Sequence, residues 1–139
     1  MSDRVTVRPL GGKRLQGATR NHTVVTDRKT EDGGTDAGPT SGELLLLAMG
    51  SCAAGSLRSY LEQKGTSCRD LTVDVFFEPT GKFGVRDRIV IALGMDERLY
   101  ASDPEGIRVA ATSGGVNSRM KLGSEIEVRF TGRGGETGV

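Results

Sequence analysis

The sequence predicts a single domain of the α+β class, built from antiparallel strands and two helices. Strand-like stretches lie towards both ends of the chain, and a helix-like stretch over residues 41–64 separates them. Strands and helices that are segregated in this way are typical of α+β folds. The chain has 139 residues and no internal repeat, so we expect one domain over residues 1–139.

The N-terminal stretch predicts two strands, at residues 4–9 and 22–26, where β-branched side chains roughly alternate with polar ones. A third strand between them is optional, because Gly11-Gly12 and residues 16–18 both look like turns. Residues 31–39 (EDGGTDAGP) cannot hold a regular element and predict a loop.

Residues 41–64 give the strongest helix signal in the chain. Thr40 and Glu43 have the spacing of a capping box, and Gly65 stands where a helix commonly ends. The first half, which includes the run 44–49 (LLLLAM), is apolar all round, so we expect it to be buried on all sides. The second half is amphipathic and should emerge into water.

The last stretch returns mainly to strands. Residues 70–77 alternate, with Leu71, Val73, Val75 and Phe77 on one face. Asp103-Pro104 begins a second helix over residues 103–113. Two further strands are expected over 87–94 and 124–130.

Composition excludes several classes of function. The net charge is +1, which argues against nucleic acid as a partner. Aromatic residues make up only 4% of the chain, so its core must be aliphatic and lean, and oligomerisation would add buried area. No run reaches the ~18 apolar residues that span a bilayer, and the charged first residues do not form a signal peptide. We therefore expect a cytoplasmic protein with reduced thiols and no membrane partner.

Cys52 lies in the middle of the long helix, and every residue from 50 to 56 is small. A free cysteine is often a small buried hydrophobe, and this reading stays open. Thiol chemistry would need a nearby cation or a helix N-terminus, and the dipole of its own helix fades before mid-helix. The candidate cations are Arg14, Arg20, Arg28 and Arg119. Glu43 precedes Cys52 by nine residues, which puts it on the opposite face of an ideal helix.

The remaining reactive residues predict neither a metal site nor a disulfide. His22 is the single histidine, and the two cysteines are far apart, so we expect no metal or other cofactor. Twelve helical residues after Cys52 span ~18 Å, whereas a disulfide needs Cα atoms within ~7 Å. Cys68 is therefore expected to be an incidental thiol in a surface turn.

Residues 38–52 (GPTSGELLLLAMGSC), continuing to Lys64-Gly65, closely resemble the core motif of the OsmC/Ohr family, the osmotically inducible and organic hydroperoxide resistance proteins. Residues 33–37 (GGTDA) resemble one branch of that family. The resemblance implies antiparallel sheets around a long central helix, in an intertwined homodimer with active sites near the interface. It also implies a role in oxidative stress, in which a reactive cysteine reduces organic hydroperoxides without metal or flavin. Cys52 matches that cysteine by position.

The chain also departs from the family pattern. The resolving cysteine would stand at residues 114–116, which are Gly-Gly-Val here, and the glutamate of the peroxidase branch is replaced by Gly42. Glu43 matches a glutamate of the less characterised branch. The family's catalytic arginine lies in the N-terminal strands, where Arg14 and Arg20 are candidates. The expected site is therefore Cys52, Glu43 and Arg20.

Two functional hypotheses follow. In the first, the protein is a one-cysteine peroxidase that reduces hydroperoxides through Cys52 and is recycled by an external thiol reductant. Its sulfenic acid would then persist and over-oxidise more readily. In the second, it is not an enzyme but binds a small apolar ligand at the dimer interface or senses oxidants through Cys52. A purely structural role for Cys52 is the third reading.

Overall fold

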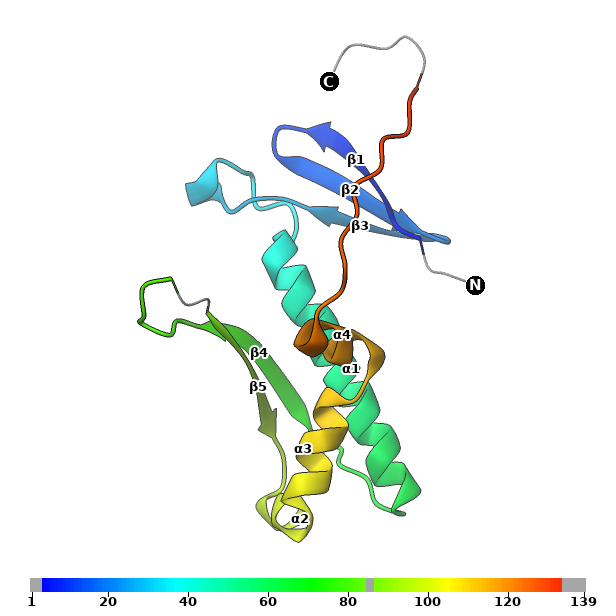
Figure 1. Cartoon of the computed structure of the whole chain (residues 1–139), viewed down its shortest axis with the longest axis vertical. Helices are drawn as coiled ribbons and strands as arrows, with labels where there is room; N and C mark the ends of the chain where they lie inside the picture. Colours follow the sequence, from blue (N-terminus) through cyan, green and yellow to red (C-terminus); the bar gives the residue numbers. More distant parts are fainter. Residues whose placement is uncertain (1–3, 85–86, 134–139) are drawn as a thin grey trace.

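The computed structural model describes residues 4–84 and 87–133, and its α+β architecture agrees with the sequence prediction (Figure 1). Two antiparallel sheets accompany one long helix. The elements in chain order are β1 (Thr6–Gly11), β2 (Arg14–Thr19), β3 (His22–Thr26), a 3-10 turn (Thr30–Asp32), α1 (Ser41–Gln63), β4 (Thr72–Glu78), β5 (Arg88–Gly94), α2 (Glu97–Ser102), α3 (Pro104–Thr112) and α4 (Gly115–Leu122).

The N-terminal sheet has the order β1-β2-β3 and lies at the N-terminal end of α1 (Figure 1). The turn expected at residues 16–18 is wrong, because these residues form the middle of β2, where Gly17 pairs with Val7 and Val24. The turn expected at Gly11-Gly12 is confirmed, since β1 ends at Gly11 and Gly12 has φ of 57°, and the second reversal lies at Arg20, which has φ of 52°. A glycine inside a strand is tolerated where neighbouring side chains cover it, and Val5 and Val7 lie beside Gly17.

Both ends of α1 are formed as the sequence predicts. The Thr40 hydroxyl accepts from the Glu43 N–H at 3.1 Å, and the Glu43 carboxylate accepts from the Thr40 N–H at 2.9 Å. At the other end Gly65 adopts φ of 75°. Its N–H donates to the Glu62 carbonyl, and the N–H of residue 66 donates to the Leu61 carbonyl, which is the Schellman arrangement.

The burial expected for the first half of α1 is not found within the single chain. The fully buried side chains lie every fourth residue from mid-helix onwards: Met49, Ala53, Leu57 and Leu61. The leucine run of residues 44–47 is half-buried at best, and Leu47 is 65% exposed. The reason is that α3, β4 and α4 are the described elements that pack most against α1, and the side chains of α1 that become buried all lie from Met49 onwards.

The core of the chain joins α1 to α3, with Leu57, Leu61, Ile107 and Ala110 at its centre. The predicted helix over 103–113 is confirmed as α3, which Asp103 caps through the Gly106 N–H. The β4–β5 hairpin also agrees with the prediction, since Val73 and Val75 are half-buried and lie against Gly50 of α1.

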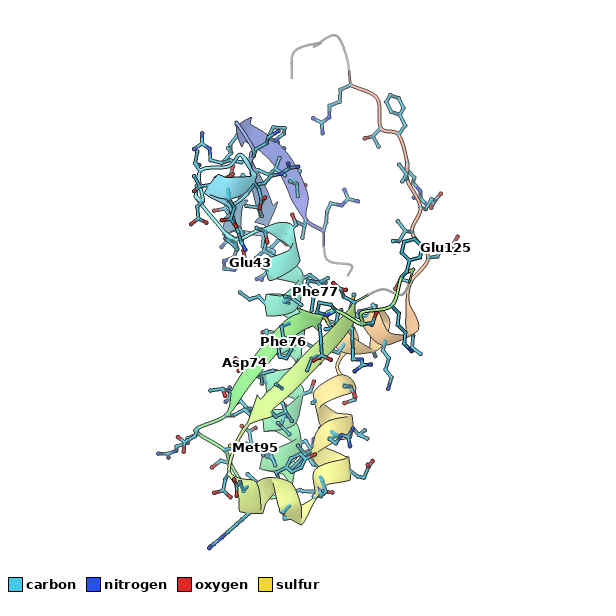
Figure 2. All side chains as sticks on the ribbon, turned by 90° about the vertical axis from the view of Figure 1, so that its left-hand side faces the viewer. Glu43, Asp74, Phe76, Phe77, Met95 and Glu125 are labelled. Atoms are coloured by element: carbon cyan, nitrogen blue, oxygen red, sulfur yellow. The ribbon has the colours of Figure 1, made fainter. Side chains whose placement is uncertain are left out.

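The strand expected at residues 124–130 is wrong for this single chain. The segment is extended, but it pairs with no described strand, and Ile126, Val128 and Phe130 are 89–93% exposed. It leaves α4 and runs towards the end of the molecule that carries the N-terminal sheet (Figures 1 and 2). A strand needs a hydrogen-bonded partner, and the described part of the chain does not supply one.

Helix α1 is long and apolar enough to cross a membrane, as judged by length and composition alone. The core helices of soluble proteins share this property, and α1 contributes four side chains to the buried interior of the fold. Nothing further about a membrane follows from it.

Candidate thiol site

Cys52 is half-buried and lies where α1 meets the start of α4. A Cβ placed on Gly114 would collide with both Cys52 Sγ and Ser56 Oγ, at separations well inside the 3.0 Å that real Cβ atoms keep. The thiol and the hydroxyl therefore occupy the space where residue 114 would carry a side chain. From the sequence, residue 114 was predicted only as a place where the family's resolving cysteine is absent, and Ser56 was not predicted to be part of the site.

The start of α4 gives the thiol a polar neighbour. Gly114 is the N-cap of α4, has extended backbone angles and makes no side-chain cap. The first N–H groups of a helix have no partner within the helix, and together they carry partial positive charge. A helix N-terminus is one of the settings that stabilise a thiolate. Cys52 Sγ lies beside such an N-terminus, at Gly114.

Among the four candidate arginines, Arg119 belongs to the helix whose N-cap lies beside Cys52. Its Nη1 is 3.5 Å from the position that a Cβ on Gly115 would take, so the guanidinium folds back along α4. Arg14 is in the β1–β2 turn, where it donates to the Gly11 carbonyl at 3.4 Å. Arg20 is exposed in the β2–β3 turn, and Arg28 follows β3. No described contact joins Arg20 to Cys52.

Glu43 is engaged at the other side of α1. Hydrogen bonds from the Thr40 backbone, and then from its side chain, lower the pKa of the Glu43 carboxyl, and Lys29 adds a favourable charge. Glu43 lines a groove of about 510 Å³ between α1 and β4, together with Leu46, Gly50 and Val75. Figure 2 shows it at the start of α1, above the part of β4 that carries Phe76 and Phe77. Cys52 does not line this groove.

A second groove, here named the α1–α3 groove, leads towards Cys52. It has a volume of about 440 Å³, and its lining includes Gly114, against which Cys52 Sγ packs, and Ser56, whose hydroxyl also lies against Gly114. Hydroxyl, amide and small side chains form much of its wall: Ser56, Ser59, Tyr60, Gln63, Gly106, Val109, Ala110, Ser113 and Gly114. A polar thiol could approach Cys52 along this route.

Tyr60, Lys64 and Asp103 form a cluster at the far end of the α1–α3 groove. The Tyr60 hydroxyl and the Lys64 ammonium both donate to the Asp103 carboxylate, and Lys64 Nζ lies 4.7 Å from the centre of the Tyr60 ring. Lys64 and then Tyr60 lower the pKa of Asp103 to about 2, and Asp103 raises the pKa of Lys64. The cluster ties α1 to the cap of α3.

Cys68 takes a different place from the one expected. It is half-buried and packs against the core of Leu57, Leu61 and Ile107, rather than standing free in a surface turn. Cys52 and Cys68 are both free thiols. Within residues 4–84 and 87–133 no group of three histidine, cysteine or acidic residues could hold a metal ion.

Residues 33–98 match the family model described as OsmC-like protein. A solved structure from Psychrobacter arcticus, described as an osmotic stress induced and detoxification response protein, has a TM-score of 0.66 at 16% identity, over 82% of this chain and 85% of that chain.

A second solved structure is from Legionella pneumophila and is described as an organic hydroperoxide resistance protein OsmC, predicted redox protein, regulator of sulfide bond formation. It has a TM-score of 0.61 at 12% identity, over 87% of this chain and 90% of that chain. At these identities the likeness shows the fold. No curated protein sequence matches the chain.

Proposed function

The chain belongs to the OsmC-like family, and on that premise we propose that it is a one-cysteine thiol peroxidase that reduces organic hydroperoxides through Cys52. The observation that carries the proposal is the packing of Cys52 Sγ against Gly114, at the N-terminus of α4. The thiol is half-buried among small groups, so a small substrate can reach it. The Legionella pneumophila relative, described as a hydroperoxide resistance protein, supports the substrate class.

The reaction balances with an external thiol. The Cys52 thiolate attacks one peroxide oxygen, the O–O bond breaks, and the alkoxide that leaves takes a proton to become an alcohol. Cys52 is then a sulfenic acid. One external thiol condenses with it to a mixed disulfide and releases water, and a second thiol displaces Cys52 as a free thiol. One hydroperoxide and two thiols give one alcohol, one disulfide and one water.

Gly114 explains why the recycling thiol must come from outside this chain. A cysteine at residue 114 could not be accommodated without displacing Cys52 or Ser56. Cys68 packs into the core around Leu61 and is not among the residues that meet Cys52 at Gly114. The α1–α3 groove supports an approach for an external thiol, because its hydroxyl-rich wall includes Gly114, against which Cys52 Sγ packs.

Arg119 and the start of α4 are proposed to stabilise the Cys52 thiolate. Both lie on the segment that packs against Cys52, and both carry positive charge. The family's pattern instead points to an arginine of the N-terminal strands, for which Arg20 remains the prediction. Glu43 also remains a predicted site residue, and in this chain its carboxylate is held by Thr40.

A homodimer is part of the proposal. The chain exposes 11309 Å² of surface, whereas a folded monomer of 14.7 kDa exposes about 7,000 Å². The excess is about 4,000 Å² per chain, or about 8,000 Å² per pair, which is more than the roughly 2,000–5,000 Å² in total that obligate dimers commonly bury, and part of it comes from the exposed segment after α4. The exposed leucine run of α1 and the unpaired alternating segment at residues 126–130 support an intertwined partner. We place the protein in the cytoplasm, where external thiols are reduced.

The alternative is a non-enzymatic member of the family that binds a small apolar ligand or senses oxidants. The groove between α1 and β4 favours it, since Leu46, Leu47, Val73 and Val75 form much of the wall. Such a protein would bind or oxidise without turnover.

Steady-state consumption of tert-butyl hydroperoxide with dithiothreitol separates these functions. We expect turnover by the wild type and by Cys68→Ser, and none by Cys52→Ser. If the wild type consumed the hydroperoxide no faster than dithiothreitol does without protein, the peroxidase proposal would be rejected and the non-enzymatic alternative would remain.

A further inference from the structure

Ser56 lies one helical turn after Cys52 on α1, and its hydroxyl has no hydrogen-bond partner in the described part of the chain. A serine or threonine inside a helix commonly donates to a carbonyl of the preceding turn, as Thr112 does to Arg108. Asn117 Oδ1 is the side-chain oxygen that is both buried and unpartnered among the described residues, so Ser56 Oγ, which also lacks a partner, must be open to solvent. Ser56 therefore presents a free and accessible hydroxyl.

This hydroxyl lies beside the thiol. Ser56 Oγ and Cys52 Sγ are each within 2.5 Å of the point that a Cβ on Gly114 would occupy, so the two atoms are no more than about 5 Å apart. Ser56 also lines the α1–α3 groove, whose lining residues include no charged side chain. A substrate oxygen that reaches the sulfur along this groove thus meets a neutral hydrogen-bond donor.

On the premise that Cys52 reduces hydroperoxides, we propose that Ser56 is a further catalytic residue, whose hydroxyl donates a hydrogen bond to the leaving oxygen of the peroxide. The thiolate attacks the peroxide oxygen that carries the hydrogen, the S–O bond forms as the O–O bond breaks, and negative charge moves to the oxygen attached to carbon. That oxygen is then only two bonds from the sulfur, so a hydroxyl within about 5 Å of Sγ can reach it. Solvent supplies the proton that completes the alcohol, in exchange for the proton that Cys52 released on ionisation, and Ser56 keeps its own.

Two oxidants with different leaving groups test this hydrogen bond. A donor placed where charge develops helps a basic leaving group most, and tert-butyl hydroperoxide releases the strongly basic tert-butoxide, whereas peracetic acid releases the stable acetate ion. We expect Ser56→Ala to slow oxidation of Cys52 by tert-butyl hydroperoxide about tenfold, since a hydrogen bond to a charged group accounts for that difference. Its rate with peracetic acid should stay at the wild-type value. Single-turnover mixing, quenching and intact mass give both rates, with Cys68→Ser in every protein so that one thiol reacts.

Two controls separate this role from a change in the thiol itself. Ser51→Ala is the matched variant, because Ser51 directly precedes Cys52 and is exposed in the groove between α1 and β4, and it should react as the unmutated site does. Alkylation of Cys52 by iodoacetamide, which releases iodide and needs no donor, should be unchanged in Ser56→Ala. Equal slowing of both oxidants and of alkylation, or no slowing at all, would overturn the role of Ser56. If Cys52 with Ser56 intact reacted with tert-butyl hydroperoxide no faster than a free thiol, the peroxidase proposal itself would fail, and this inference with it.

Discussion

The contact between Gly114 and Cys52 makes a quantitative prediction. Gly114→Ala adds a Cβ that meets Cys52 Sγ and Ser56 Oγ far inside normal contact. The backbone angles of residue 114, φ −66° and ψ 160°, suit alanine, so any cost arises from the collision and not from backbone strain. Forcing one extra carbon into a packed site costs about 1–3 kcal/mol. We expect that loss in the free energy of unfolding.

A double-mutant cycle isolates the collision. In a background of Cys52→Ala with Ser56→Ala both colliding atoms are gone, and Gly114→Ala should cost less than about 0.5 kcal/mol. Urea unfolding followed by circular dichroism gives the four free energies. Gly115→Ala is the control, because its Cβ would lie 3.5 Å from Arg119 Nη1, an ordinary contact. Equal costs of Gly114→Ala in the two backgrounds would refute the placement of Cys52 beside Gly114.

Three other predictions concern charge and assembly. Arg119→Gln should slow the reaction of Cys52 with tert-butyl hydroperoxide by up to about fivefold in stopped-flow kinetics, while Arg119→Lys should keep most of the rate. If both variants reacted at the wild-type rate, Arg119 would not belong to the site. The lowered pKa of Asp103 stabilises the folded state, and this contribution is complete above about pH 4 and is lost as the pH falls towards 2. Between pH 4 and 2 the free energy of unfolding of Asp103→Asn should therefore fall less steeply than that of the wild type. Light scattering should give the wild type a mass of twice 14.7 kDa and the Val128→Asp variant the mass of one chain. A wild type with the mass of one chain would contradict the proposed dimer.

Local signals predicted most of the elements. The capping box at Thr40, the terminal Gly65 and the alternation along residues 70–77 all act over a few residues, and each is found in the structure. Helix α4 was missed because its eight residues have no side-chain cap and no regular apolar stripe. The 124–130 segment has the right alternation, but a strand also needs a partner, and alternation alone cannot supply one.

The candidate site was less predictable. Mid-helix burial and small neighbours identified Cys52, but its contact partner Gly114 is 62 positions away and has no side chain to attract notice. Asn117 gave no signal at all, because one asparagine on a polar helix looks like a surface residue. In the structure it is a buried residue of α4, and its side-chain amide donates to the carbonyls of Met49 and Ala111, which only the folded packing brings together.

The central claim is that Cys52 is a peroxide-reactive thiol, and one measurement tests it most directly. The reduced protein is mixed with one equivalent of tert-butyl hydroperoxide, and intact mass is recorded with a sulfenic-acid-specific probe. We predict fast addition of one oxygen at Cys52, unchanged in Cys68→Ser, absent in Cys52→Ser and reversed by dithiothreitol. Oxidation of Cys52 no faster than that of Cys68 or of a free thiol would contradict the claim.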